Sequence, residues 1–333
     1  VISDMFPKPP QFGHAKAMAG KGSERAAAKR AALSDAGAFA AKSFEEFVEK
    51  IEGLETNITD DTTDYATLIA DMQTRQHALI ASSVSKDVEG EVHILGEELL
   101  SFAKNNSFAY EVGSLFLGRK LQSKETEKFI DFVLRLLVDH GPYVSGAVNT
   151  IVTARAGANL VSSLSAGLLT IGPRFGGAIN DAAGNWLRAI RDNQKPYDFV
   201  ESFAKQKKYI LGIGHRKYRI DFPDPRVQEL IGFAKVLKST RFTTFAKDVE
   251  KITTAKKGNL ILNVDGAIAA ILLDILSEKE GMLDEELQRL VETEFFNALF
   301  VLSRSVGFIA HFLDQKRLDE GLFRLTEDQV AEA

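Results

Sequence analysis

Residues 128–142 read KFIDFVLRLLVDHGP and combine an apolar run with an abrupt end. Apolar side chains occupy almost every side of this run at helical spacing, so residues 128–138 are predicted to form a buried central helix. Gly141 and Pro142 break such a helix, because glycine favours a turn and proline lacks a backbone N–H. The pattern therefore places His140 in a turn at the end of a buried helix, where the backbone can approach a ligand.

Two further stretches set an acid–base side chain beside glycine at the end of an apolar segment. They are Gly212-Ile213-Gly214-His215-Arg216, after residues 209–211, and Asn263-Val264-Asp265-Gly266, after residues 260–262. Two histidines and one aspartate suit proton transfer, and neighbouring arginines suit a substrate with several carboxylates. Taken singly, each histidine could be a satisfied structural residue and Asp265 only a helix N-cap. Together, His140, His215 and Asp265 favour a catalytic set.

The fold class is predicted to be all-α with a minor β hairpin. A length of 333 residues suits two domains, or one large domain with an appendage. Ser43 and Glu46 form a capping-box pattern for a helix over 44–52, and the polar, acidic residues 53–64 are typical of a linker. Hairpin strands are expected at 78–84 and 91–95, and further helices at 23–36, 143–156, 158–170, 177–192, 197–206, 225–238, 242–251, 265–278 and 284–315.

Composition narrows the function classes. A net charge of -5 argues against a general nucleic-acid binder, and the absence of cysteine excludes disulfides and thiolate chemistry. No metal-ligand spacing, Walker loop or dinucleotide fingerprint occurs, so no metal site is expected. No signal peptide is visible, and the most apolar run, 266–276, is too short to span a bilayer. We expect a cytoplasmic protein with neither a membrane nor a nucleic acid as partner, and a piece of a longer chain.

Several segments resemble, nearly word for word, the active-site segments of the citrate synthase superfamily. They are His140-Gly-Pro-Tyr-Val-Ser-Gly-Ala-Val-Asn149, Gly-Ile-Gly-His215-Arg216 with the following Pro-Asp-Pro-Arg226, Asn-Val-Asp265-Gly, and the surroundings of Arg304 and Arg324. The likeness is greatest to the citryl-CoA lyase part of ATP-citrate lyase. It covers residues 65–333 and implies a citrate synthase-like helical fold of a large and a small domain, the small one at approximately 197–300.

The resemblance also implies how the residues divide the work. His140, His215 and Asp265 would be catalytic, and carboxylates of the substrate would be held by Arg226, Arg304 and Arg324, with Arg216 as a further candidate. In the family, the arginine at the position of Arg324 reaches a neighbouring subunit's site. Contacts to CoA are expected from Ile213, Gly214, Lys256 and Lys257, although the two lysines could equally be a solvated pair of loop charges.

One departure from citrate synthases is informative. Where they place a third histidine, which polarises the acetyl thioester, this chain has Phe175, which cannot donate a hydrogen bond. The backbone N–H groups of Gly176 and Gly177 would then have to form the oxyanion hole. The phenylalanine resembles ATP-citrate lyase and citryl-CoA lyase, so it favours cleavage over synthesis.

The beginning of the chain carries a second resemblance. Phe12-Gly13-His14-Ala15-Lys16-Ala17 resembles the phosphohistidine loop of succinyl-CoA synthetase and of the upstream half of ATP-citrate lyase, although Lys16 replaces a glycine. Residues 1–52 are therefore interpreted as the end of an upstream CoA-synthetase-like module. His14, ATP and Mg would act only through the upstream modules of a full-length enzyme.

The function that the resemblance implies is a citryl-CoA lyase, which cleaves citryl-CoA into acetyl-CoA and oxaloacetate by a retro-Claisen reaction. CoA would be a substrate, and no cofactor would be bound covalently. Expected partners are citryl-CoA, acetyl-CoA, CoA, oxaloacetate or citrate, the upstream modules, and further copies of the chain in a homotetramer whose minimal unit is a dimer. Two alternatives stay open: a citrate synthase, and a non-catalytic oligomerisation module. His311, on the same expected helix as Arg304, is a candidate to support that arginine.

Overall fold

The computed structural model describes residues 11–12, 17–18, 25–53, 82–172 and 175–331. The chain divides into two compact units, residues 1–79 and residues 80–333. The first unit contains α1 (Ala26–Asp35), α2 (Phe44–Glu52) and a pairing of β1 (Gln11–Phe12) with β2 (Ala17–Met18). The linker predicted at 53–64 lies, apart from Gly53, outside the described residues, as does His14.

The start of α2 confirms the capping pattern, because the Ser43 hydroxyl accepts the N–H of Glu46 at 3.2 Å. By contrast, α1 begins at Ala26, later than the predicted residue 23. From Ala26 onward the helix consists mainly of good helix formers.

The second unit opens with a three-stranded antiparallel sheet of β3 (Ser85–Val88), β4 (Glu91–Ile94) and β5 (Glu97–Glu98). The first strand lies later than predicted, because the turn consists of Glu89 and Gly90 alone, both with positive φ. This tight turn pairs Val88 with Glu91 and carries the ladder back to Ser85, opposite Ile94. The predicted hairpin therefore exists, in a different register.

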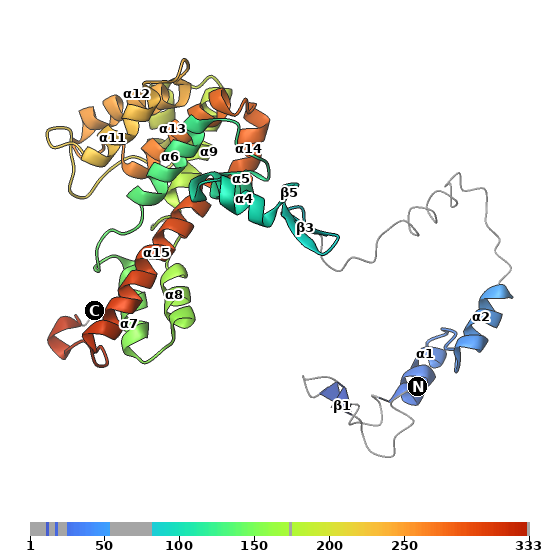
Figure 1. Ribbon diagram of the computed structural model, residues 1–333. Helices are drawn as coiled ribbons and strands as arrows, with labels where there is room; N and C mark the ends of the chain where they lie inside the picture. The colour runs from blue at the N-terminus through green and yellow to red at the C-terminus, as the bar shows by residue number, and fades with distance from the viewer. Residues whose placement is uncertain (1–10, 13–16, 19–24, 54–81, 173–174, 332–333) are drawn as a thin grey trace. The chain divides into compact units, whose positions relative to one another are not determined.

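Helices make up the rest of the second unit (Figure 1). Several begin at a side-chain cap: Asp224, for example, accepts the N–H of Arg226 before the helix that starts with Pro225. The helices are α4 (Leu99–Asn105), α5 (Phe108–Leu117), α6 (Lys124–Leu136), α7 (Ser145–Arg155), α8 (Leu160–Leu168), α9 (Ala178–Arg191), α10 (Pro196–Lys205), α11 (Pro225–Ala234), α12 (Arg241–Lys256), α13 (Val264–Lys279), α14 (Asp284–Glu292), α15 (Phe295–Leu318) and the short 3₁₀ helix η3 (Glu327–Gln329).

The central helix of the core is α13, which is buried along almost its whole length from Val264 to Leu276. It packs against α6, α9, α11, α12 and α14, which surround it in Figure 1. The helix predicted at 128–138 is instead part of the amphipathic α6. Its inner face buries Phe129 and Val133, while Asp131 and Arg135 form an ion pair on its outer face.

The predicted helix 284–315 is divided in two. Glu294 has a φ of 59° and interrupts the helical geometry between α14 and α15. From this break α15 runs out of the group around α13 and lies along α7 and α8 (Figure 1). Its length and apolar composition alone would allow it to cross a membrane, but its buried face packs within the helical core.

Candidate active site

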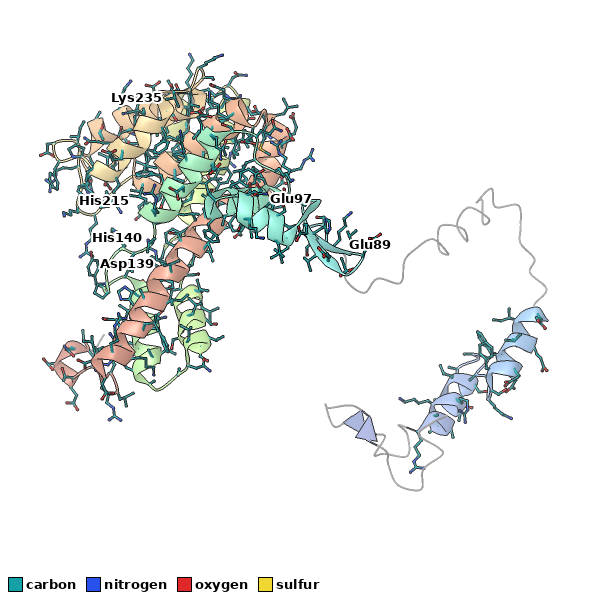
Figure 2. All side chains as sticks on the ribbon, viewed as in Figure 1. Glu89, Glu97, Asp139, His140, His215 and Lys235 are labelled. Atoms are coloured by element: carbon teal, nitrogen blue, oxygen red, sulfur yellow. The ribbon has the colours of Figure 1, made fainter. Side chains whose placement is uncertain are left out.

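The three predicted catalytic segments meet in space. The turn after α6, the loop before α11 and the start of α13 converge beside α15, and Figure 2 shows His140, His215 and Asp139 on the same side of the unit. Together they enclose a pocket of about 200 Å³ lined by Leu137, His140, Phe175, Gly176, His215, Arg226, Asn263, Val264, Asp265, Phe300 and Arg304.

A contact between two glycines joins the His215 loop to the Asp265 helix. A Cβ atom on Gly266 would lie 2.3 Å from the carbonyl oxygen of Gly212, and one on Gly212 would lie 2.7 Å from the Cα of Gly266. Only two glycines permit this approach, since any side chain would push the segments apart. The glycines predicted to break the helices therefore also bring the two segments together.

Backbone hydrogen bonds hold the ring of His215. Its Nδ1 accepts the N–H groups of Lys217 and Tyr218, both at 3.0 Å. The proton of the neutral ring therefore resides on Nε2, which becomes a hydrogen-bond donor. Desolvation, the largest cause, lowers the pKa of His215, so the ring is neutral at pH 7.

Arg226 lies beside His140 and is itself fixed by an ion pair. The buried carboxylate of Asp224 binds its Nε at 3.0 Å and its Nη2 at 2.7 Å, which leaves Nη1 3.3 Å from Nδ1 of His140. A guanidinium can only donate, so this contact also places the neutral ring's proton on Nε2. Desolvation and the positive charges of Arg226 and Arg304 lower the pKa of His140, which favours the neutral ring.

Asp265 is not the N-cap of α13, which was the structural alternative to a catalytic role. The N-cap of α13 is Asn263, whose side chain accepts the N–H of Gly266 at 3.0 Å. Asp265 lies in the first turn of α13 and is one of the residues that line the pocket. Burial raises its pKa to about 6, against the opposing effect of Arg226 and Arg304. This carboxyl group can therefore gain or lose a proton near neutral pH.

Arg304 is the buried cation of the pocket. It is only 4% exposed and stacks on the ring of Phe300, with its guanidinium carbon 4.8 Å from the ring centre. Its Nε and Nη1 have no hydrogen-bond partner among the described residues. A buried guanidinium without partners is costly, and a carboxylate is the kind of group that would satisfy these two N–H donors.

Only one of the two backbone N–H groups predicted to form the oxyanion hole is available to a substrate. Phe175 and Gly176 line the pocket, but the N–H of Gly177 already donates to the carbonyl oxygen of Gly172 at 3.0 Å. Gly177 is therefore unsuited to bind a substrate oxygen. The N–H of Gly176 has no hydrogen-bond acceptor among the described residues, and a Cβ there would lie 2.1 Å from the Phe300 ring.

Other predicted residues do not line this pocket. Arg216 and Arg324 are exposed and contribute no pocket lining, and Lys256 forms an ion pair with Glu201 at 2.7 Å. Ile213, Gly214 and Lys257 are not among the lining residues either, although Gly214 is bound by Asn263 at 3.0 Å. The predictions that these residues bind CoA or a carboxylate stay predictions.

Sequence reasoning missed the partners that orient the site. Asp224 was quoted only as part of a motif, yet it fixes Arg226, and its position directly before Pro225 at a helix start was the available signal. His311 was expected to support Arg304. Its Nε2 instead lies 3.1 Å from Oδ1 of Asp139, a pairing between positions 172 residues apart that no local pattern indicates.

Comparisons with known proteins agree with this arrangement. A protein named probable ATP-citrate synthase from Dictyostelium discoideum is 39% identical over 99% of this chain and 55% of its own length. The structure of ATP citrate lyase from Methanothrix soehngenii in complex with citrate and coenzyme A is 38% identical, with a TM-score of 0.73 over 99% of this chain and 56% of that chain. This chain thus spans about half the length of these relatives.

A shorter relative is covered almost completely. The structure of citryl-CoA lyase from Hydrogenobacter thermophilus is 28% identical, with a TM-score of 0.65 over 77% of this chain and 94% of that chain. The sequence model of the family described as "Citrate synthase, C-terminal domain" matches residues 14–326. The chain with this helical fold and this pocket therefore belongs to the citrate synthase family.

Proposed function

We propose that this chain cleaves citryl-CoA into acetyl-CoA and oxaloacetate. One observation carries the proposal: a carboxyl group with a pKa near 6 shares a small pocket with two neutral imidazoles and a buried, unpaired arginine. Scaffolding needs none of these costly features. The likeness to citryl-CoA lyase and to a lyase structure that holds citrate and coenzyme A supports this choice of substrate.

Binding of the citryl group is assigned to the arginines. Arg304 offers its unsatisfied Nε and Nη1, and Arg226 is held rigidly by Asp224, so neither must reorganise when a carboxylate arrives. A substrate carboxylate would also remove the cost of the buried charge on Arg304. Binding energy is thereby concentrated on the carboxylate-bearing half of the substrate.

Cleavage requires charge to be stabilised on two oxygens. As the carbon–carbon bond breaks, the hydroxyl oxygen becomes the ketone of oxaloacetate, and the Nε2–H of His215 and of His140 suit hydrogen bonds to it or to an adjacent carboxylate. The thioester oxygen becomes an enolate oxygen, for which the N–H of Gly176, without an acceptor among the described residues, is the candidate donor. Both histidines thus act here as donors rather than as bases, and the hydroxyl proton passes to the carboxylate of Asp265.

Asp265 completes the reaction at carbon. In its protonated form it delivers a proton to the enolate carbon and releases acetyl-CoA, and in the reverse direction the carboxylate removes that methyl proton. A pKa of about 6 places both forms within reach at neutral pH.

Assembly is part of the proposal. Arg324 is exposed and has no partner among the described residues, which supports a role in the pocket of a second copy. Such sharing requires at least a two-fold dimer, and we propose the homotetramer as the complete assembly, together with upstream ATP-citrate lyase modules. Lys256 and Lys257 remain candidates for CoA phosphates in that assembly.

The experiment supplies the purified chain with citryl-CoA and follows oxaloacetate and acetyl-CoA, with and without ATP and Mg²⁺. The proposal expects equal amounts of both products at a rate that ATP does not change. Arg304→Met is the matched negative control, since it leaves all three acid–base groups in place. Absence of cleavage by a folded, oligomeric chain would contradict the proposal.

A further inference from the structure

One face of α15 contacts the segment that carries His140 at three points. Ser303, Gly307 and His311 recur every four residues and so lie on the same side of the helix. The Ser303 hydroxyl donates to the carbonyl oxygen of Leu134, at the end of α6. At Gly307 a Cβ atom would lie 2.2 Å from the carbonyl oxygen of Val138, so the loop backbone touches the helix there.

The third contact on this face joins a histidine to a carboxylate. His311 Nε2 lies 3.1 Å from Oδ1 of Asp139, and the two side chains are only 17% and 39% exposed. The other carboxylate oxygen of Asp139 accepts the N–H of Gly141 at 2.9 Å. Asp139 therefore connects the residue that follows His140 to α15, and His140 is enclosed between the two contacts.

His140 has little else to hold it. His140 is exposed. Its Nδ1 lies a long 3.3 Å from Nη1 of Arg226, and the centre of its ring lies 6.4 Å from the centre of the Tyr143 ring. His215 differs, because two backbone N–H groups bind its ring directly. The orientation of His140 must therefore come from the backbone of its turn.

We propose that His311 is a positioning residue: with Asp139 it forms a latch that fixes the 139–141 turn on α15 and so aims His140 at the substrate. The proposal rests on the proposed function for its kinetic consequence, but its structural content does not. Neither His311 nor Asp139 lines the pocket, so the latch acts only through His140. The arrangement requires a proton on Nε2 of His311, which donates to the carboxylate.

The test compares His311→Leu with His311→Gln. The Gln side chain can place an N–H near the position of Nε2, whereas Leu keeps the volume and removes the donor. A misplaced catalytic group can cost on the order of 10²-fold, and we expect kcat for citryl-CoA cleavage to fall about tenfold in His311→Leu, with KM nearly unchanged. His311→Gln should retain most of the activity. His93→Leu, on β4, is the control for loss of a histidine outside the pocket.

A second readout needs no turnover. The ¹⁵N–¹H spectrum of the histidine rings reports the tautomer of His140 directly, and we expect its fixed Nε2–H form to give way to exchange in His311→Leu but not in His311→Gln. Asp139→Asn should weaken the same Nε2–H signal of His140. If His311→Leu does not fold, Asp139→Asn takes its place in the comparison. An unchanged His140 spectrum in the latch variants would overturn the latch even if the chain cleaves citryl-CoA. A changed spectrum supports it even if cleavage is not detected.

Discussion

Arg304 and Arg324 lie twenty residues apart in one stretch of chain, in opposite surroundings. Arg304 is buried in the pocket without a partner for Nε and Nη1 among the described residues, whereas Arg324 is exposed beyond the end of α15. Burying an unpaired charge lowers stability, so the chain bears this cost only where an anion is to be bound. An exposed arginine stays hydrated and carries no such cost, so its exposure leaves it available to a second molecule.

The segment that carries Arg324 is nevertheless held in place. The Nε of Arg155, at the end of α7, donates to the carbonyl oxygen of Gly321 at 2.6 Å, and its guanidinium lies 5.5 Å from the centre of the Phe323 ring. Figure 1 shows this end of the chain beside α7. The pocket arginine is thus fixed by burial, and the outer arginine by a clamp on the neighbouring backbone.

Replacing Arg304 should produce the largest effect. Arg304→Met removes the buried carboxylate-binding cation while keeping apolar volume, and a hydrogen bond to a charged group contributes about 1.5–3 kcal/mol. Two such bonds predict a fall in kcat/KM for citryl-CoA of at least about 100-fold. The melting temperature should rise, because the unpaired charge is gone. A lower melting temperature with unchanged kcat/KM would show that Arg304 is structural.

Replacing Arg324 should have a smaller effect of a different kind. Arg324→Ala should lower kcat/KM about tenfold, the value of one charge-assisted contact, without changing the melting temperature. Mixing these chains with Asp265→Asn chains tests sharing: in a mixed dimer one pocket carries both defects and the other carries neither. Random exchange then restores about a quarter of the wild-type activity. Proven exchange without recovery would confine Arg324 to its own chain.

The pH dependence of stability provides the third prediction. The pKa of Asp265 is raised from 3.8 to about 6 on folding, so the folded chain holds a proton there that the unfolded chain has lost. The contribution of Asp265 to stability therefore falls as pH rises from about 4 to 6 and levels off above 7. The side chain of Asp265→Asn does not ionise, so the variant does not lose stability as pH rises through this pKa. Its free energy of unfolding at pH 7 should exceed that of the wild type by roughly 1–3 kcal/mol.

Denaturant titrations of both proteins from pH 4 to pH 8 measure the difference in free energy of unfolding. The excess in free energy of unfolding of Asp265→Asn over the wild type should grow as pH rises to about 6.5. A loss of stability on replacement at every pH would instead show that Asp265 stabilises the fold in its charged form.

Local patterns predicted the parts of the site that glycine marks. His140, His215 and Asp265 follow apolar segments that end at glycine, and all three line the pocket. Their convergence depends on the close approach of Gly212 and Gly266, which the same residues permit. The helical fold class was equally readable from apolar periodicity.

Features set by distant contacts were not predictable. The pairing of His311 with Asp139 and the capture of the Gly177 N–H depend on where the chain returns in space. The break at Glu294 carries no glycine or proline signal, because the residue that adopts the left-handed conformation there is a glutamate. The central role of α13, rather than α6, follows from packing on all sides of one helix.

Proton transfer by Asp265 at carbon is the central claim, and solvent exchange measures it directly. The chain is incubated with acetyl-CoA and oxaloacetate in D₂O, and deuterium in the acetyl methyl group is followed by NMR. The account predicts enzyme-dependent exchange that falls by about 10²–10⁴-fold in Asp265→Asn, while Arg324→Ala, with its acid–base groups intact, retains a larger share. Exchange at the wild-type rate in Asp265→Asn would contradict the account.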